Sequence, residues 1–505
     1  MKIVLGPPGT GKTTKLLNLV EYFLEKGVPP DKIGYFAFTR RAAIEAIDRA
    51  SVKFNLTKKD LPFFRTLHSL AFMQAGLKHS QVITSEHYQD VADWLRIGKF
   101  YLENGMDQGP YKDIGYGDKF LEIINMSRIL QKPLKEIYTK SNVPLKTDWD
   151  RVSYVDRGIR HFKKAKDLYD YTDMLEVFVN MNLAPKLDVV FIDEAQDLSP
   201  IQWKMVELLE KNSKECFVAG DDDQAIFRYA GADVNHFVNL QGEVSLLNQS
   251  YRIPSLHHSM ANRVINQIVG RREKDFAPRN EDGAIKWYRH SAEVDLKDGE
   301  WLLLARTNRG AQQIEEEVRT RGHLYIFNNS RSIDKKTVDA VRLWQGLLAG
   351  DRVTKDEVKL VYSKMLLRNQ IEYGSKTMPN GREGELYGLE DLKNHHGLLH
   401  SLPWEQGLGK IAEKDKQYLK SCLRKGESLT KEPRIRISTI HSSKGAQADN
   451  VMLLTDTMRR PYSMWRKDEH HAEDEARVFY VGLTRAKNNL HLIHPMFSQG
   501  YNIPQ

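Results

Sequence analysis

Short, unbroken hydrophobic runs alternate with stretches of helical spacing in the first part of the chain. An unbroken apolar run of four to eight residues is typical of a strand that is buried on both faces. Strands of this kind that alternate with amphipathic helices indicate a parallel sheet with helices on both sides. We therefore expect strands at 2–6, 33–39, 189–195 and 215–221, and helices at 13–27 and 40–50.

A second alternation of the same kind begins near residue 256, with hydrophobic runs at 285–290, 301–307, 434–441, 450–456 and 489–495. Two other regions are helical in spacing, polar and interrupted by loops, which indicates insertions. The predicted fold class is therefore α/β, with two domains of parallel sheets that each carry a mostly helical insertion. The first domain covers 1–75 and 166–255 with its insertion at 76–165, and the second covers 256–330 and 431–505 with its insertion at 331–430.

Composition adds little beyond a folded chain with a basic surface. The 505 residues are 41% hydrophobic and 28% charged, which argues against disorder. A net charge of +8 favours polyanionic partners, although a solvated basic surface without a specific role has the same composition. Cys216 and Cys422 lie too far apart for a Cys-x-x-Cys pair, so neither a disulfide framework nor a cysteine zinc site is expected. No apolar run approaches the roughly 18 residues that span a bilayer, and no signal-peptide core is visible.

The most specific motif follows the first predicted strand. Residues 6–13 read GPPGTGKT and match G-x-x-x-x-G-K-[ST] between a strand and a helix. Glycines let backbone N–H groups turn towards phosphate oxygens, and the helix dipole favours the same anion. Lys12 can reach the β- and γ-phosphates, and the Thr13 hydroxyl can ligate Mg²⁺. The residues expected on the nucleotide are Gly6, Pro7, Pro8, Gly9, Thr10, Gly11, Lys12, Thr13 and Thr14.

Two adjacent acids end the predicted strand at 189–195. Asp193 can hold Mg²⁺, and Glu194 can orient and deprotonate an attacking water. By itself this pattern is weak, because acidic residues often begin helices. Together with the phosphate loop it indicates a nucleoside triphosphatase. It does not say what the hydrolysis drives.

Six further blocks occur in a fixed order along almost the whole chain. The acidic pair itself belongs to a block DEAQD at 193–197. The six further blocks are FTRRAA at 38–43, TLHS at 66–69, GDDDQAIFRYAGA at 220–232, NQSYR at 248–252, TIHSSKG at 439–445 and YVGLTRA at 480–486. In content and order they resemble the UvrD/Rep family of superfamily 1 DNA helicases. The resemblance implies two RecA-like P-loop domains with ATP between them, and 1B-like and reduced 2B-like insertions.

The resemblance also assigns roles at the ATP site. Gln224 resembles the residue that senses the γ-phosphate, and Tyr251 the residue that stacks on adenine. Arg252 and Arg485 resemble the two arginine fingers that stabilise negative charge on the transferred phosphoryl group. Gly445 is also expected among the nucleotide-binding residues. The alternatives are a turn glutamine, a core tyrosine and arginines in surface ion pairs.

The same blocks imply a track for single-stranded DNA. Aromatic stacking tolerates any base, which suits a motor that must step along a strand of any sequence. Tyr229 and Phe64 are the preferred stacking candidates, and Arg41 is a further phosphate contact. The alternative is that the aromatic residues belong to the core and the charges to a solvated face. The predicted DNA-binding residues are Phe38, Thr39, Arg40, Phe64, His68, Phe227, Tyr229, His441 and Lys444.

Three departures from the family pattern affect nucleotide choice and coupling. The phosphate loop starts so early that the family's upstream glutamine motif, which selects ATP, has no room in this sequence. Ala230 stands where the family usually has arginine, and Gln447 where it usually has glutamate. Either change could weaken the coupling between the ATP and DNA sites.

We therefore expect an ATP- and Mg²⁺-dependent DNA helicase that moves 3′-to-5′ on single-stranded DNA and opens duplex junctions in repair, recombination or replication. Possible partners are replication or repair proteins, and the chain would be a monomer or weak oligomer. We expect it in the cytoplasm, on the nucleoid, or in a host cytoplasm if a phage encodes it. Alternatives are a translocase that strips proteins from DNA, a non-motor DNA-binding protein with a vestigial nucleotide site, and RNA as the track.

Overall fold

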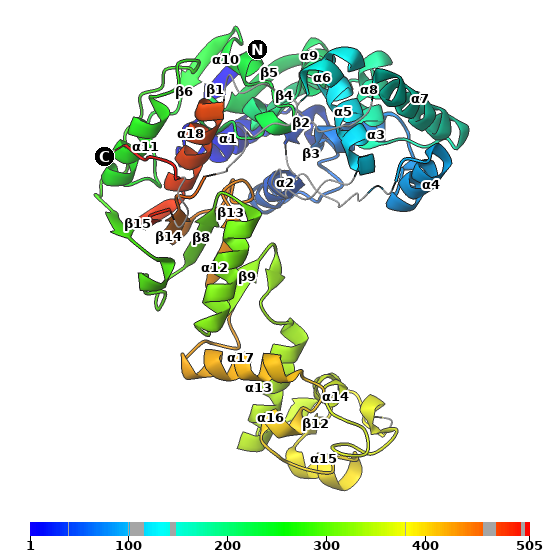
Figure 1. Ribbon diagram of the computed structural model, residues 1–505, viewed down its shortest axis with the longest axis vertical. Coiled ribbons are helices and arrows are strands. Elements are labelled where there is room, and N and C mark those ends of the chain that lie inside the picture. The colour runs from blue at the N-terminus through cyan, green and yellow to red at the C-terminus, as the bar shows by residue number, and fades with distance from the viewer. Residues whose placement is uncertain are drawn as a thin grey trace. The chain divides into compact units, whose positions relative to one another are not determined.

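The chain divides into two compact units in the computed structural model (Figure 1). The structure describes residues 1–38, 40–98, 100, 116–141, 148–378, 380–457, 471–495 and 500–504. The first unit comprises Met1–Trp287, Ile440–Gln447 and Thr455–Gln505, and the second comprises Tyr288–Thr439 and Ala448–Leu454. Among the described residues, no helix combines the length and the apolar character needed to cross a membrane.

The first unit is built on a six-stranded sheet with the order β3-β2-β4-β5-β1-β6, and every pairing in it is parallel. This confirms the predicted parallel sheet and the four predicted strands. Because the strands run parallel, the ends of β1, β4 and β5 meet at one edge, where Leu5 pairs with Gly220 and Ile192 with Val218. The strands are β1 (Lys2–Leu5), β2 (Ile33–Ala37), β3 (Phe64–Thr66), β4 (Leu187–Asp193), β5 (Ser213–Gly220) and β6 (Glu243–Leu246).

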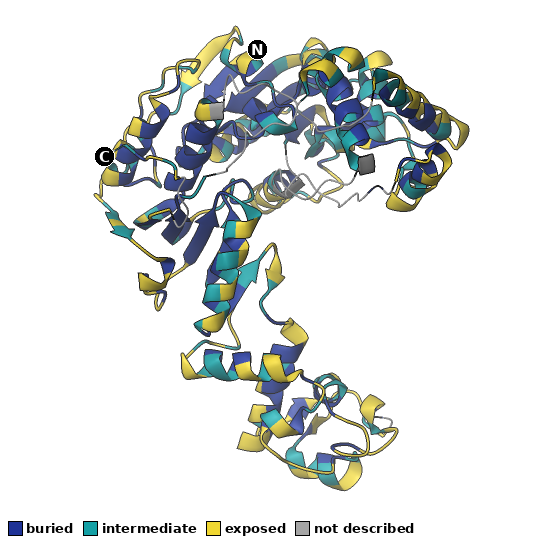
Figure 2. Ribbon diagram, in the orientation of Figure 1, coloured by how far each residue is buried: buried dark blue, intermediate teal, exposed yellow. Residues whose placement is uncertain are grey.

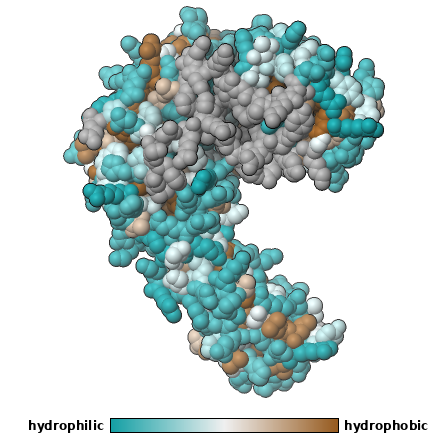
Figure 3. Space-filling view, in the orientation of Figure 1, coloured by the Kyte–Doolittle hydropathy of each residue, from teal (hydrophilic) through white to brown (hydrophobic). Residues whose placement is uncertain are grey.

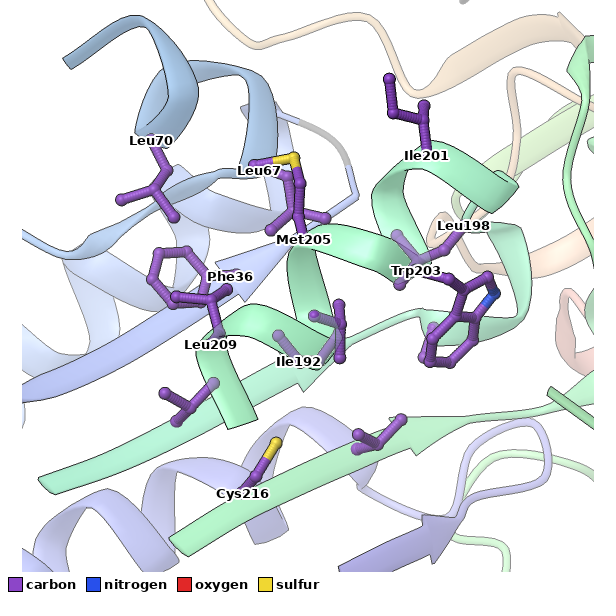
Figure 4. Close-up of a cluster of buried hydrophobic side chains, with 14 of the residues drawn as sticks. Phe36, Leu67, Leu70, Ile192, Leu198, Ile201, Trp203, Met205, Leu209 and Cys216 are labelled. Carbon is purple, nitrogen blue, oxygen red and sulfur yellow. The ribbon is translucent and has the colours of Figure 1, made fainter. Parts of the chain in front are cut away.

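Alternate residues of these strands belong to two separate hydrophobic cores, one on each face of the sheet. One core contains Ile3 and Ile192 and packs under α3 (Leu67–Gln74), α8 (Tyr171–Asn180) and α9 (Pro200–Lys211). Figure 4 shows part of it around Trp203 and Met205. The other core takes the intervening strand residues, such as Val4 and Phe191, and packs under α1 (Lys12–Glu25) and α2 (Arg40–Phe54). Burial on both faces explains why the strands are unbroken apolar runs.

The helical region between β3 and β4 has a core of its own. Its helices are α4 (Ser85–Leu95), α5 (Tyr116–Ile129), α6 (Leu134–Lys140) and α7 (Trp149–Ala165). The helical character predicted for 76–165 is confirmed for the described residues. Arg128 on α5 pairs with Asp170 at the start of α8 over 2.8 Å, which ties this region to a helix of the sheet's own core.

The first unit ends with elements that follow the sheet in sequence. These are α10 (Val234–Val238), α11 (Ser255–Ile265), most of β7 (Ala284–Tyr288), α18 (His471–Leu483) and β15 (Ala486–Ile493). Helices α11 and α18 pack against each other, so a segment near the C-terminus joins the unit that carries the phosphate loop.

The second unit contains strands in the order β10-β9-β13-β8-β14 and a separate group of helices. Strands β9, β13, β8 and β14 are parallel, β10 is antiparallel to β9, and α12 (Asn308–Thr320) packs on β8 and β13. The runs predicted at 301–307, 434–441 and 450–456 are confirmed as strands. The strands are β8 (Trp301–Ala305), β9 (Tyr325–Phe327), β10 (Ser330–Arg331), β13 (Ile435–Thr439) and β14 (Ala448–Leu454).

The regular structure of the region 331–430 is mainly helical, as predicted, and long loops join the helices. It contains α13 (Lys335–Ala349), α14 (Lys355–Ser363), α15 (Leu389–His395), α16 (Trp404–Gly407), α17 (Glu413–Arg424) and the antiparallel pair β11 (Val353–Thr354) and β12 (Leu386–Tyr387).

Burial and hydropathy follow the layers of each unit. In Figure 2 the strands are mostly buried and the exposed residues follow the outer faces of the helices. The surface visible in Figure 3 is mainly hydrophilic, with apolar areas that include part of the helical region of the second unit. Exposed leucines in that region are Leu348, Leu366, Leu367, Leu386, Leu399 and Leu402.

Candidate nucleotide and nucleic-acid site

The phosphate loop joins β1 to α1 at the edge where the parallel strands end. Gly9 and Gly11 have φ of +76° and +78°, a left-handed conformation that suits glycine. A Cβ on Gly6 would lie 2.5 Å from Cγ of Lys12, so the missing side chain makes room for the lysine. The Thr10 hydroxyl donates to the carbonyl of Pro7 over 2.8 Å and closes the turn.

Lys12 and Glu194 form an ion pair at this edge, with Nζ 3.1 Å from Oε1. Burial favours the neutral form of Lys12, but the carboxylates of Glu194 and Asp193 outweigh it and raise the pKa of the lysine. Burial works against the charge of Glu194 as well. There the positive charges of Lys12 and Lys444 prevail and lower its pKa to about 2. Both partners are therefore charged at neutral pH.

Asp193 lies beside the hydroxyl of Thr13. Thr13 Oγ1 donates to Asp193 Oδ2 over 3.3 Å, and the Tyr35 hydroxyl donates to the same oxygen over 2.7 Å. Burial, followed by the charge of Glu194, raises the pKa of Asp193. A hydroxyl and a carboxylate side by side are hard oxygen donors of the kind that Mg²⁺ prefers, so these residues fit the ion. No sequence pattern pointed to Tyr35, whose position depends on the pairing of β2 with β4.

Gln196, Asp197 and Lys444 surround the other side of Glu194. Gln196 Nε2 donates to Glu194 Oε2 over 2.5 Å. Lys444 donates to a carboxylate oxygen of Asp197 and to the carbonyl of Gln224, and its Nζ lies 3.8 Å from Glu194 Oε2. Burial raises the pKa of Asp197 to about 6, even though the charge of Lys444 opposes the shift. Lys444, predicted as a DNA-binding residue, therefore lies among acidic groups of the hydrolytic site.

The two predicted arginine fingers lie in the same unit as the phosphate loop. Arg485 Nη2 donates to Gln224 Oε1 over 2.9 Å, and the amide nitrogen of Gln224 donates to Asp221 Oδ2 over 2.8 Å. Burial, followed by the positive charge of Arg252, lowers the pKa of Arg485 to about 9. Burial also lowers the pKa of Arg252 to about 10. A Cβ on Gly9 would lie 2.5 Å from Cβ of Arg252, so this arginine packs directly on the phosphate loop.

Tyr251 reaches the surface next to the phosphate loop. Its backbone N–H donates to the carbonyl of Gly9 over 2.9 Å, and the Ser250 hydroxyl donates to the carbonyl of Pro8 over 2.8 Å. The Tyr251 side chain is 75% exposed, which excludes the core alternative and leaves its ring free to stack on a base. Gly445 has φ of +81° and directly follows Lys444.

Comparison with known proteins decides the family. The UvrD/REP helicase N-terminal domain matches residues 2–245, and the UvrD-like helicase C-terminal domain matches residues 411–495. Together these matches cover about two thirds of the chain. The chain belongs to the UvrD/Rep family of superfamily 1 helicases.

Relatives of this UvrD/Rep family chain carry helicase names. The "Putative ATP-dependent DNA helicase YjcD" of Bacillus subtilis (strain 168) is 23% identical, over 99% of this chain and 77% of that protein. The "Probable DNA helicase II homolog" of Mycoplasma genitalium is 22% identical, over 97% and 82%. The "ATP-dependent DNA helicase PcrA" of Staphylococcus aureus (strain Mu50) is 20% identical, over 100% and 82%. Among solved structures, the PRRSV helicase gives a TM-score of 0.32 at 10% identity, and the match covers 100% of this chain and 54% of that one.

Four of the predicted DNA-binding residues of this UvrD/Rep chain gather into one aromatic cluster. The ring of Phe227 lies 5.4 Å from Phe38, 6.1 Å from Tyr229 and 6.3 Å from His441. Lys444 Nζ lies 5.3 Å from the centre of the Phe227 ring. Because Lys444 also contacts Asp197, this cluster is joined directly to the acids of the ATP site.

Other predicted DNA-binding residues lie elsewhere. Phe64 is 2% exposed and stacks on Tyr35 with ring centres 5.5 Å apart, in the core shared with α1 and α2. Phe64 therefore lies in the hydrophobic core, which is the alternative to a DNA-binding position. His68 contacts Tyr171 edge to face, and burial lowers the pKa of this histidine to about 4. Thr39 and the side chains of Arg40 and Arg41 lie outside the described residues.

Proposed function

We propose that this UvrD/Rep family chain is an ATP-dependent DNA helicase that moves 3′-to-5′ on single-stranded DNA and opens the duplex ahead. The observation that carries the proposal is the joining of two sites by Lys444. Its ammonium group contacts the acids beside Glu194 and also lies over the ring of Phe227. The names of the relatives, which describe ATP-dependent DNA helicases, support the same function.

Hydrolysis would use the groups gathered at the sheet edge. Backbone N–H groups of the loop around Gly9 and Gly11 would bind the phosphates, and Lys12 would exchange Glu194 for phosphate oxygens. The released carboxylate of Glu194, already ionised, would then orient the attacking water and accept its proton. Thr13 and Asp193 would hold Mg²⁺, whose charge offsets that of the phosphates.

Two arginines would stabilise the charge that develops during transfer. Arg252 packs on the phosphate loop, and Arg485 is held by Gln224 at the end of β5. Fixed positive charge in a buried site is effective because little water screens it. Tyr251, exposed beside Gly9, would stack on the base and contribute to nucleotide affinity.

The aromatic cluster supports a nucleic-acid track next to this chemistry. Phe38 and Tyr229, whose side chains are half-buried, would hold bases without reading them, and the buried rings of Phe227 and His441 pack against these two. A strand that displaced Lys444 from Phe227 would alter its contacts with Asp197 and Glu194, which gives a direct route for DNA to stimulate hydrolysis. The polarity rests on the resemblance of the blocks at 220–232 and 480–486 to those of the family, and the choice of DNA over RNA rests on the family resemblance as a whole.

Release of inorganic phosphate, measured with and without oligo(dT), tests the proposal. We expect a strong stimulation by the oligonucleotide and a loss of at least about a hundredfold in Lys12→Ala. Lys15→Ala is the matched control, because Lys15 lies exposed on the same helix and should keep wild-type turnover. Wild-type protein that releases no phosphate above background would refute the function, and an active Lys12→Ala would refute the assignment of the phosphate loop.

A further inference from the structure

Three consecutive aspartates, Asp221, Asp222 and Asp223, lie buried directly after β5. Their side chains are at most 1% exposed, and one carboxylate oxygen from each lies within 4.8 Å of the others. Like charges this close in a buried site repel one another strongly unless positive charge is supplied. The arrangement therefore requires a cationic partner.

Lys274 supplies that charge from the segment between α11 and β7. Its side chain is 1% exposed, and its Nζ lies 3.2 Å from Asp221 Oδ1 and 3.0 Å from Asp223 Oδ2. It also donates to Asp222. Burial disfavours the charge of Lys274, but the three carboxylates outweigh burial and raise its pKa. The ammonium group of Lys274 thus lies among the three carboxylates of the cluster.

Asp221 connects this lysine to the ATP site. While its Oδ1 faces Lys274, its Oδ2 accepts a hydrogen bond from the amide nitrogen of Gln224 over 2.8 Å. A glutamine amide has one donating and one accepting end, so a partner on the nitrogen fixes which way the oxygen points. The oxygen of Gln224 accepts from Arg485 over 2.9 Å. Lys274, Asp221, Gln224 and Arg485 therefore form one continuous chain of contacts.

We propose that Lys274 is a positioning residue for ATP hydrolysis: it fixes Asp221 so that the amide oxygen of Gln224 faces Arg485. This role rests on the proposed function, since Gln224 and Arg485 matter only if the site hydrolyses a nucleotide. Without Lys274, Asp221 loses the cation that holds its carboxylate in place. The amide of Gln224 can then turn, and Arg485 loses one of the acceptors that orient its guanidinium group.

Arg271 provides a matched comparison from the same segment. It makes two hydrogen bonds to Asp223, of 2.8 and 2.6 Å, and it makes none to Asp221 or Gln224 among the described contacts. Arg271→Met therefore removes a cation from the same cluster without breaking the chain that leads to Arg485. A purely structural need for positive charge would make both residues equally important.

The test compares phosphate release with saturating oligo(dT) for wild type, Lys274→Met, Lys274→Arg and Arg271→Met. Lys274→Met should lower kcat by about tenfold or more, which matches the loss of a charged hydrogen bond, with KM for ATP within about twofold. Lys274→Arg should recover most of the loss, and Arg271→Met should stay within about twofold of wild type. Equal losses in Lys274→Met and Arg271→Met would overturn the positioning role.

A double-mutant cycle separates positioning from general damage. If Lys274 acts through Gln224, Lys274→Met should cause no further loss of kcat in a Gln224→Ala background. Additive losses would overturn the proposal. If circular dichroism shows that Lys274→Met does not fold, Asp221→Asn serves the same purpose, because it keeps the side-chain size and removes the charge that Lys274 pairs with. Asp221→Asn should also lower kcat, and wild-type turnover in that variant would overturn the role.

The proposed function and this role fail in different ways. A wild-type chain without DNA-stimulated hydrolysis overturns both of them. If wild type is active and Lys274→Met has the same kcat, only the positioning role is overturned.

Discussion

The guanidinium group of Arg485 donates a hydrogen bond to the side-chain oxygen of Gln224 over 2.9 Å, across 261 positions of sequence. The two residues belong to sequence blocks at 480–486 and 220–232, and the packing of α18 on the short helical turn at Asp222–Gln224 brings the blocks together. A γ-phosphate that binds here would compete with Gln224 for the arginine. The pair therefore offers a direct means by which nucleotide binding can change contacts at the end of β5.

Arg485→Lys should lower kcat by about a thousandfold, in line with the loss of an arginine finger. Lysine keeps the charge, but its single nitrogen cannot replace the two separate donors of Arg485, Nη2 to Gln224 and Nε to the carbonyl of Val481. Single-turnover phosphate release in the presence of oligo(dT) measures the effect, and thermal unfolding checks that the protein still folds. A kcat within about threefold of wild type would remove Arg485 from the hydrolytic site.

Tyr251→Ala should raise KM for ATP by about tenfold while kcat changes little, because stacking on the base contributes equally to the ground and transition states. Tyr251→Phe keeps the ring and should behave like wild type. The side chain is 75% exposed, so neither variant should shift the melting temperature. Steady-state kinetics over a range of ATP concentrations decide the point. An unchanged KM in Tyr251→Ala would show that the ring does not bind the nucleotide.

Phe64 and Tyr229 should give opposite results when each is replaced by alanine. Phe64 stacks on Tyr35 in the core, and its loss should cost about 3–5 kcal/mol of stability. Tyr229 lies in the aromatic cluster, and its loss should weaken oligo(dT) binding by about tenfold with little change in melting temperature. Thermal unfolding and fluorescence anisotropy separate the two effects. A stable Phe64→Ala that has lost DNA binding would instead place Phe64 on the track.

Asp197 should make stability depend on pH between about 4 and 6. Burial raises its pKa from 3.8 to about 6, so the folded state binds the proton more tightly than the unfolded state. Stability from this group is then fully present below the unfolded pKa and is lost as pH rises through about 6, by up to about 3 kcal/mol. The variant Asp197→Asn carries an amide at this position, which does not titrate in this range.

The measurement is the melting temperature of wild type minus that of Asp197→Asn across this pH range. We expect this difference to fall as the pH rises from 4 to 6 and to level off beyond it. A difference that rises over the same range would mean that Lys444 holds Asp197 ionised in the folded state.

Sequence patterns predicted the strands well, because a strand buried on both faces has to be apolar throughout. The parallel order also places Gly6 and Asp193 at the same edge of the sheet, on strands β1 and β4 that flank β5, so the pairing of phosphate loop and acidic box follows from local motifs. These features depend on residues that are close in sequence or on a repeated period.

Contacts that depend on packing between distant parts of the sequence could not be predicted in the same way. Tyr35 reaches Asp193 only through the register of β2 and β4, and Lys274 reaches Asp221 from a segment without regular structure. Phe64 lies on a strand of three residues, too short for alternation to show which face it occupies. The motif around it predicted DNA contact, whereas packing against Tyr35 buries the ring.

The central claim is that hydrolysis at Glu194 drives movement along one DNA strand. Its most direct test is the separation of paired duplexes that carry either a 3′ or a 5′ single-stranded tail, with ATP and Mg²⁺ and with Lys12→Ala as the inactive control. We predict that wild type unwinds the 3′-tailed duplex in an ATP-dependent manner and leaves the 5′-tailed duplex intact. Vigorous phosphate release without separation of either duplex would contradict the claim of a helicase and indicate a translocase that does not unwind DNA.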